Sequence, residues 1–334
     1  MIRQVLARLP IDPYLLLLIA TVALAALLPA QGAGKVLADG AVTVAVALLF
    51  FLYGARLSPT AVWSGMAHWR LQALVFGSTF VLFPLIGLGA QAALRGVLPH
   101  DVLVGVVYLC LLPSTVQSSI AFTSIARGNV PAALCSASVS NLAGVVVTPL
   151  LVSLLLPGAG VWFSAKALCD IGMQILLPFV AGQAARPFIG DWLLRHRLLT
   201  SVVDRGSVLL VVYAAFSAGM VAGVWTQLSV GDLGAVLAVD VAVLGAVVVV
   251  TTCASRALGF GIADEIAIVF CGSKKSMAGG IPMATILFPG HAVGLIVLPL
   301  MLFHQAQLFV CATLARRYGA RDEASAEALT PVAA

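Results

Sequence analysis

The sequence predicts an all-α membrane protein with ten transmembrane helices, arranged as two inverted repeats of five helices each. Hydrophobic residues make up 61% of the 334 residues and charged residues only 9%, whereas soluble proteins have about 45–50% apolar and about 25% charged residues. The apolar residues gather into ten runs, and about 20 such residues cross the ~30 Å hydrocarbon core of a bilayer. Two of these runs, the fourth and the ninth, are interrupted by polar residues, and paired interruptions are typical of folds built from inverted repeats.

Charged residues, proline and glycine bound the ten predicted spans. In chain order the spans cover residues 13–28, 36–53, 71–94, 102–125, 130–156, 165–185, 208–225, 233–254, 266–288 and 292–314. The first span follows two arginines, as a signal peptide does, but the nine further runs favour a retained first span. Residues 58–69 predict a short interfacial segment with Trp63 and Trp69 as anchors.

The most charged connection, residues 186–205, is predicted to be a linker and the seam of the chain. Residues 1–190 would then hold the first repeat (spans one to five) together with span six of the second repeat. Residues 191–320 would hold spans seven to ten, and residues 321–334 a disordered cytoplasmic tail. We expect all of this to form one intertwined membrane domain.

Lysine and arginine are distributed unequally between the two sides of these spans. One side collects 13 of them and the other only three, with Lys274 and Lys275 left inside the membrane, which accounts for all 18. The positive-inside rule therefore places both termini in the cytoplasm and the protein in the cytoplasmic, or inner, membrane. Because the positive charge lies in loops, we expect the lipid bilayer, and no nucleic acid, as a partner. The oligomeric state stays open.

The ninth span carries two lysines at its centre. A lysine facing lipid there costs about 2.5–3.5 kcal/mol on insertion scales, so Lys274 and Lys275 should face protein, water or a ligand. Three glycines and Pro282 surround them and predict a break over residues 272–282. Broken backbone at membrane depth is tolerated only where it is buried or lines a cavity. The fourth span has a corresponding break at residues 113–119.

The two predicted breaks supply most of the candidate binding residues, which are Thr115, Gln117, Ser118, Ser119, Ser273, Lys274, Lys275 and Ser276. Exposed amide groups at half-helix N-termini and two ammonium groups favour an anion. Alternatively, the hydroxyls bond back to their own helices and the lysines extend to an interface. If the segment is helical, the two lysines point ~100° apart, and only one of them need face a cavity.

Other polar residues in the spans have less definite roles. Asn141 of the fifth span is a further candidate, since a tight turn joins its span to the broken fourth span. Asp170 and Asp240 are lysine partners, proton carriers or solvated acids near an interface. The six cysteines have no CxxC pair and are expected to be small buried residues rather than metal ligands. No enzyme motif is present, and we expect neither an enzyme nor a cofactor.

The chain resembles the bile acid:sodium symporter family. The resemblance is carried by residues 113–119, 126–130 and 148–151 and by the broken ninth span, with Ser118-Ser119 similar to the family's Ser-Asn on its first crossing helix. It implies two inverted five-helix repeats that form a panel domain and a core domain, in which two discontinuous helices cross. It also implies a small organic anion as substrate, moved by alternating access with sodium.

The sequence departs from that family at the positions of its sodium ligands. The resemblance aligns Phe270 with a metal-binding glutamate and Lys274 with a glutamine, while Thr79, Ala133 and Ala137 replace further oxygen ligands. This is similar to a divergent branch with a Gly-Ser-Lys-Lys-Ser motif. We therefore predict a secondary transporter of an organic anion, for which sodium and a proton are the candidate coupling ions. Because the sodium ligands are missing, our hypothesis is that Lys274 takes the place of the sodium ion. A passive channel and a regulatory membrane protein that only binds its ligand are the alternatives.

Overall fold

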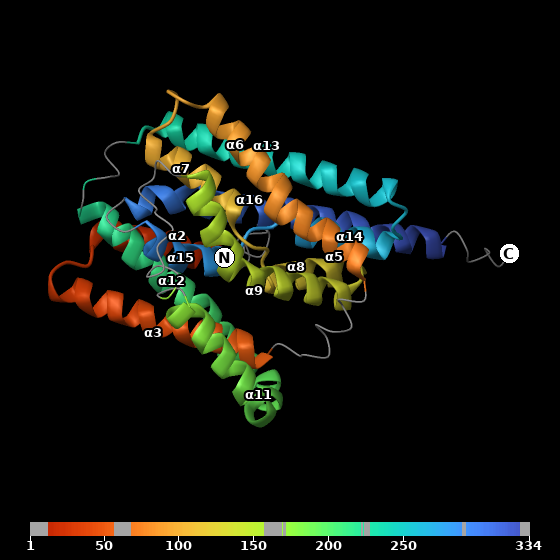
Figure 1. Ribbon diagram of the computed structural model, residues 1–334, viewed down its shortest axis with the longest axis horizontal. Helices are drawn as coiled ribbons and strands as arrows, with labels where there is room; N and C mark the ends of the chain where they lie inside the picture. Colours follow the sequence, from red (N-terminus) through yellow and green to blue (C-terminus); the bar gives the residue numbers. More distant parts are fainter. Residues whose placement is uncertain are drawn as a thin grey trace, which may run out of the picture. The chain divides into compact units, whose positions relative to one another are not determined.

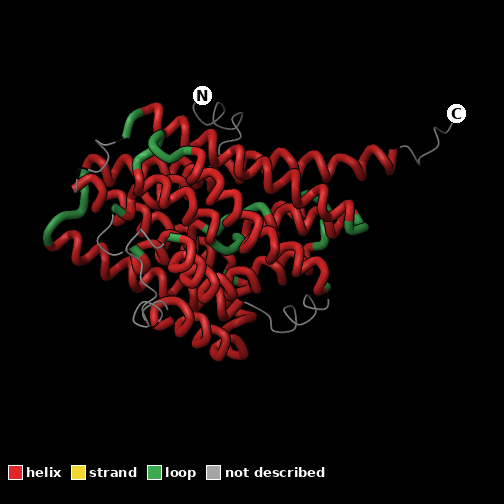
Figure 2. Tube along the Cα trace, turned by 45° about the horizontal axis from the view of Figure 1, so that its top comes forward, coloured by secondary structure: helices red, strands yellow, loops and turns green. Residues whose placement is uncertain are grey.

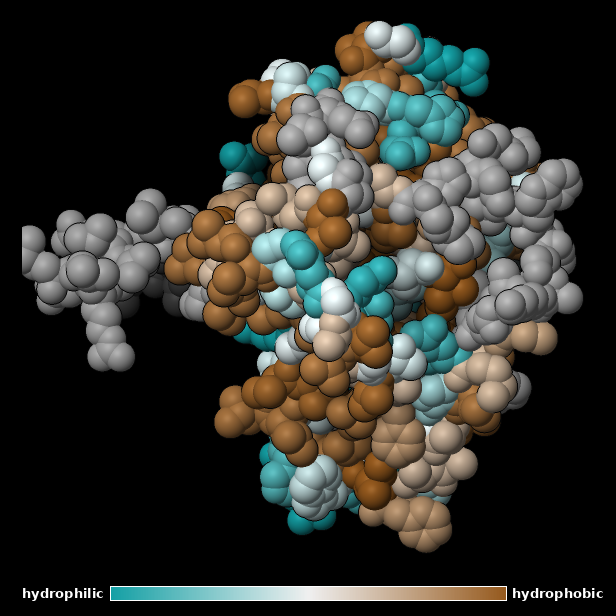
Figure 3. Space-filling model, turned by 90° about the vertical axis from the view of Figure 1, so that its left-hand side faces the viewer, coloured by the Kyte–Doolittle hydropathy of each residue, from teal (hydrophilic) through white to brown (hydrophobic). Residues whose placement is uncertain are grey.

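The computed structural model describes residues 13–56, 68–156, 169, 172–221, 223, 228–288 and 292–327. These residues are almost entirely helical and contain no strand (Figure 2). Six of their helices are long and apolar enough to cross a membrane, and apolar side chains cover much of the face seen in Figure 3. The chain is therefore a multi-pass membrane protein, as predicted, while the count of ten spans remains a prediction. Trp63 and Asp170 lie outside the described residues.

The chain divides into two compact units, each built from segments that are far apart in sequence. The first unit draws on residues 1–56, 165–228 and 281–295, and the second on residues 57–164, 229–280 and 296–334. Because the two units alternate along the chain, neither corresponds to one continuous half of the sequence.

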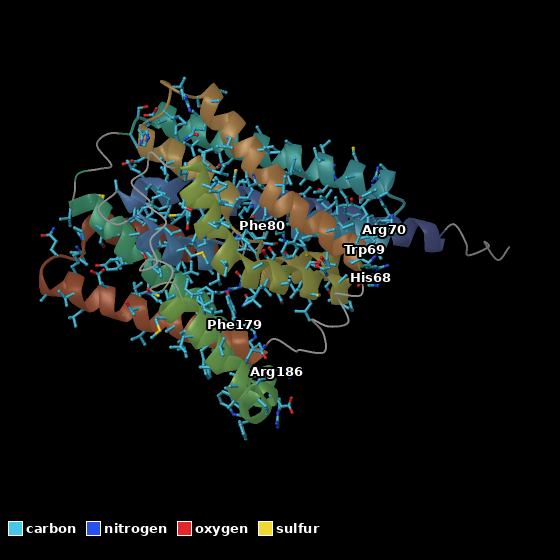
Figure 4. The ribbon with its side chains drawn as sticks, viewed as in Figure 1. His68, Trp69, Arg70, Phe80, Phe179 and Arg186 are labelled. Carbon is cyan, nitrogen blue, oxygen red and sulfur yellow. The ribbon has the colours of Figure 1, made fainter. Side chains whose placement is uncertain are left out.

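The first unit contains α2 (Pro13–Leu27), α3 (Ala33–Arg56), η3 (Gly172–Leu176), α11 (Leu177–Arg195) and α12 (Arg197–Val221). Helices α3 and α11 pack side by side (Figure 1). A Cβ atom on Gly54 of α3 would collide with the backbone of Phe179, and one on Gly182 of α11 with the backbone of Phe51. Reciprocal glycines of this kind let two membrane helices approach closely. Figure 4 labels Phe179 and Arg186, which lie two turns apart on α11.

Helices extend into the predicted linker and into the predicted tail. The predicted linker over residues 186–205 is helical, because α11 continues to Arg195 and α12 begins at Arg197. Helix α16 (Val293–Glu327) includes residues 321–327, the first part of the predicted tail; residues 328–334 lie outside the described range. In both places charge ends the apolar run without ending the helix, because Arg, Leu, Ala and Glu favour helical backbone.

The second unit holds both interrupted spans. The first consists of α7 (His100–Leu111) and α8 (Gln117–Ile125), and the second of α14 (Ile262–Gly272) and the start of α15 (Met277–Leu287). Around them are α9 (Val130–Leu155), α13 (Val230–Ala257), most of α16 and a continuous helix made of α5 (Trp69–Gly77), η1 (Ser78–Leu82) and α6 (Phe83–Ala93). This continuous helix runs beside α13 (Figure 1).

Hydrogen bonds tie the ends of these helices together. Figure 4 shows Arg70 beside His68 and Trp69 at the start of α5, where its guanidinium donates to the carbonyl of Leu258 at 2.8 Å. Arg256 at the end of α13 forms two bonds with Glu265 of α14, at 2.8 and 2.9 Å. The hydroxyl of Tyr318 on α16 donates to the same carboxylate at 2.8 Å. Glu265 thereby joins three helices at one end of the unit.

The turn between α8 and α9 is bonded to the start of α14. Asn129 accepts a bond from the backbone of Ala132 at 3.0 Å and so caps α9. Its side-chain amide donates to Asp264 at 2.7 Å, and its backbone amide donates to the carbonyl of Ala263 at 2.9 Å. These bonds connect the end of the first interrupted span to the beginning of the second.

Candidate functional site

The two interruptions contact each other inside the second unit, as predicted. The backbone amide of Ser276 donates to the carbonyl of Pro113 at 2.8 Å. The hydroxyl of Ser114 donates to the carbonyl of Cys271 at 2.6 Å, and that of Ser119 to the carbonyl of Phe270 at 3.1 Å. Irregular backbone leaves carbonyls without helical partners, and each break here supplies donors for such groups. We call this region, residues 112–119 with residues 270–280, the crossing.

Both breaks are shorter than predicted. The first covers residues 112–116, because Gln117–Ser119 form the opening turn of α8. The second covers residues 273–276, because α15 begins at Met277 and includes Pro282. Gly280 is helical, and a Cβ atom there would collide with the side chains of Leu112 and Leu300. This glycine therefore allows close packing and does not mark a break. Pro282 lacks a backbone N–H, and a membrane helix tolerates the loss of that hydrogen bond.

Lys275 lies in a cage of carbonyl oxygens. Its side chain has no exposed surface. The ammonium group donates to the carbonyls of Thr79 at 2.9 Å, Cys110 at 2.9 Å and Leu112 at 2.7 Å. The ring of Phe83 lies with its centroid 4.0 Å from Nζ. All three ammonium donors are thus used, and a cation–π contact covers the group.

Local sequence makes these three carbonyls available. Thr79 lies in the π-helical turn η1, where the donor expected in that register is the backbone nitrogen of Pro84, which carries no hydrogen. Cys110 belongs to the last turn of α7 and Leu112 follows it, so both carbonyls lie at a helix C-terminus. A cation is favourable there because the helix dipole is negative at this end.

Gln307 of α16 holds the backbone of the same lysine. Its side-chain oxygen accepts from the amide of Lys275 at 2.9 Å, and its side-chain nitrogen donates to the carbonyl of Lys275 at 3.2 Å. The same nitrogen lies 2.8 Å from Nδ1 of His304. No local sequence pattern indicates this role of Gln307, because its partner Lys275 lies 32 positions away along the chain. For the carbonyl of Thr79 the local sequence does contain a signal. Pro84, within the third predicted span, has no N–H to donate to it.

Lys274 is buried at the opposite face of the same peptide segment. Its ammonium donates to the carbonyl of Ser118 at 2.8 Å and lies 4.0 Å from the ring centroid of Phe122 and 5.3 Å from that of Phe270. Tyr318 packs edge-on against Phe270. One carbonyl and two aromatic faces therefore surround this charge.

Two expectations about the lysines are corrected. Both ammonium groups are buried inside protein, because residues 273–276 are not helical and successive side chains enter different environments. Lys274 is not paired with Asp240, and neither lysine has an acidic partner among the described residues. Asp170, the other predicted partner, lies outside those residues.

The hydroxyl candidates fall into two groups. Thr115 lies 2.7 Å from the hydroxyl of Ser118 and 3.1 Å from that of Ser119, so these three form one cluster beside Lys274. Ser273 instead donates to the carbonyl of Val269 on its own helix at 2.6 Å, and the hydroxyl of Ser276 accepts weakly from its own helix. Ser273 and Ser276 therefore follow the alternative in which hydroxyls bond to their own helices and not to a ligand.

Gln117 and Asn141 lie at the margins of this arrangement. Gln117 is exposed at the first turn of α8. Asn141 is 8% exposed, and no described residue forms a hydrogen bond with its side-chain oxygen. The α9 residue that bonds to the first break is its neighbour Ser140, which accepts from the amide of Ser114 at 3.1 Å. No group of His, Cys, Asp and Glu suited to a metal ion occurs among the described residues.

Comparison with known proteins gives consistent matches along the chain. Residues 12–320 match the SBF-like CPA transporter family. The uncharacterized protein PA2026 of Pseudomonas aeruginosa is 53% identical over 320 residues, which cover 95% of this chain and 96% of the relative. The putative symporter YfeH of Escherichia coli is 50% identical over 314 residues, or 94% of each chain. Sodium/bile acid cotransporter 7 of Rattus norvegicus is 30% identical over 275 residues, or 81% of each.

Proposed function

Because this chain belongs to the SBF-like CPA transporter family, a branch of the bile acid:sodium symporters, we propose that it is a secondary active transporter of an organic anion. Alternating access would expose the crossing to one side of the cytoplasmic membrane at a time. Membership of this family makes the chain a transporter rather than an enzyme. The names of the sodium/bile acid cotransporters support bile-acid-like anions as the first substrates to test.

One observation carries the choice of an anion. Two ammonium groups are fully buried at the crossing, and no carboxylate among the described residues pairs with them. Buried charge without a counterion is unfavourable, so an anionic ligand near the crossing would be stabilised. The first turn of α8 adds backbone donors, since no side chain caps it and its residues Gln117 and Ser118 are not fully buried.

We also propose the finer architecture that the sequence predicts. Ten spans in two inverted repeats would place both termini in the cytoplasm. The first unit would correspond to the family's panel domain and the second unit, which contains the crossing, to its core domain. The six long apolar helices and the two interrupted spans of the second unit support this proposal.

Transport is proposed to be independent of sodium. The carbonyl cage around Lys275 has the ligand chemistry with which proteins bind dehydrated monovalent cations. The covalently attached ammonium fills that cage. The residue proposed to replace a coupling cation is therefore Lys275 instead of Lys274, which contacts one carbonyl and two rings.

Reconstitution into proteoliposomes tests the transport function. Radiolabelled taurocholate is a suitable first probe, with empty liposomes as the control. Saturable uptake, and exchange against unlabelled probe in the lumen, support a transporter. Non-saturable downhill flux indicates a channel, and binding without flux indicates a ligand-binding regulatory protein; either result refutes the proposal. If taurocholate neither binds nor moves, bile acids are excluded as substrates, and the same assay with aromatic and aliphatic carboxylates decides whether any organic anion is carried.

A further inference from the structure

Asp240 is a buried carboxylate with no hydrogen-bond partner in the part of the chain that the structure describes. It lies in the middle of α13, has no exposed surface, and neither of its side-chain oxygens has a hydrogen-bond partner among the described residues. Almost all buried polar groups in proteins are hydrogen-bonded, so such a group requires an explanation. An ionised carboxylate in these surroundings would be very unfavourable.

The surroundings of Asp240 distinguish between the cations that it could take. Helix α13 packs against η1, α6 and α14. No titratable residue occurs in η1 or α6, and α14 carries Asp264, Glu265 and Cys271. A sodium ion needs several oxygen ligands, and Asp240 itself supplies two, which form no hydrogen bond with any described residue. A proton needs only one oxygen.

Asp240 is linked electrostatically to the crossing. The thiol of Cys110 on α7 lies within electrostatic range of both Asp240 and Lys275. The carbonyl of the same cysteine accepts one of the bonds from Lys275. Its side chain also packs against Gly87 of α6, where a Cβ atom would lie 2.8 Å from it. A change of charge at Asp240 would therefore act on the residue that joins α7 to Lys275.

We infer that Asp240 is a proton-binding site within the membrane and that the proton is the coupling ion. Its carboxylate takes up a proton from one aqueous side, forming an O–H bond, and releases that proton to the other side. No electron transfer is involved. Without the proton the side chain would carry a buried negative charge that forms no hydrogen bond with any described residue; with it, the side chain is neutral. The coupling role rests on the transport function proposed above, whereas proton binding does not.

Infrared difference spectroscopy tests proton binding without any substrate. The full-length protein in lipid nanodiscs should show, near neutral pH, the carbonyl stretch of a protonated carboxylic acid that shifts in D₂O. This band should be absent in Asp240→Asn and present in Asp39→Asn, in which the same change is made at an exposed acid of the first unit. In Asp240→Glu the band should move in frequency. A wild-type spectrum without the band, or a band retained unchanged in D240N and D240E, overturns the inference.

A transport assay then tests the coupling role. In sodium-free proteoliposomes an inward proton gradient should accelerate taurocholate uptake by wild type and D39N. D240N should exchange taurocholate at equal concentrations but show no acceleration by the gradient. Full acceleration of D240N overturns the coupling role. A wild type that moves no organic anion at all refutes the proposed function instead, while the infrared band still decides whether Asp240 binds a proton.

Discussion

At the scale of single residues, Lys274 and Lys275 differ in how many polar groups depend on them. Lys275 satisfies three carbonyls that have no helical donor, and Lys274 satisfies one. A buried acceptor without a partner costs about 1–3 kcal/mol. Replacing a buried charge by an apolar side chain also removes a desolvation penalty. The balance of these two effects is therefore different at the two positions.

We predict that Lys275→Met destabilises the protein strongly and Lys274→Met only weakly. The first change leaves three carbonyls unbonded, at about 1–3 kcal/mol each, and the second leaves one. Thermal unfolding of both variants in the same detergent measures the difference, with Lys35→Met as an exposed control. Equal unfolding temperatures for K274M and K275M would contradict the assigned roles.

A small cation should replace the missing side chain. Lys275→Ala leaves the three carbonyls and room for an ammonium ion, so ammonium chloride should raise its unfolding temperature relative to choline chloride. A ligand at about 100 times its Kd stabilises by about 2.7 kcal/mol. The wild type, whose cage is filled, should show no such difference.

At the scale of elements, the turn between α8 and α9 joins the two interrupted spans. Arg127 has a φ of 57°, which is unusual for a residue other than glycine. The amide of Gly128 returns to the carbonyl of Thr123 at 2.8 Å, which closes the end of α8. Ile266 of α14 occupies the space in which a side chain on Gly128 would lie. Asn129 then begins α9 and bonds to Asp264.

Asn129→Ala should therefore destabilise the second unit by more than the loss of an ordinary N-cap does. Loss of an N-cap costs about 1 kcal/mol, and a hydrogen bond to a charged group contributes about 1.5–3 kcal/mol. A double-mutant cycle of N129A and Asp264→Ala, followed by thermal unfolding, should give a coupling energy of that second size. Asn129→Asp keeps the cap but opposes two carboxylates, so it should be more stable at acidic than at neutral pH. Additive effects in the cycle would show that the bond contributes nothing.

At the scale of the whole molecule, the charge distribution predicts the orientation in the membrane. The loop between α6 and α7 contains Arg95, on the side with few basic residues, and Arg317 lies near the end of α16, on the basic side. In a cysteine-free background, a membrane-impermeant maleimide added to intact cells should label Arg95→Cys. It should label Arg317→Cys only after permeabilisation. Labelling of both positions from outside would contradict the cytoplasmic placement of the C-terminus.

Ion dependence is a second property of the whole molecule. Because a lysine fills the carbonyl cage, wild-type uptake of an organic anion should be unchanged when potassium or choline replaces sodium. Initial rates in proteoliposomes at constant ionic strength measure this. Strictly sodium-dependent uptake would show that sodium binds elsewhere and that Lys275 does not replace it.

The sequence by itself determined the membrane class, the position of most spans and the existence of two breaks. These properties are local, since hydrophobicity, proline and glycine act within a few residues of the chain. The limits of the apolar runs do not give the ends of the helices at residues 186–205 and 321–327, because a change of polarity does not end a helix.

Only the tertiary structure decided which lysine meets the carbonyl cage and that Asp240 forms no hydrogen bond with the described residues. The three acceptors of Lys275 lie 163, 165 and 196 positions away along the chain. Their carbonyls are available because a π-helical turn and a helix C-terminus meet at one point, and this depends on how η1, α7 and the segment after α14 pack. A pattern within one segment contains no information about such a meeting, so the sequence assigned the role to Lys274 and the structure assigns the cage to Lys275.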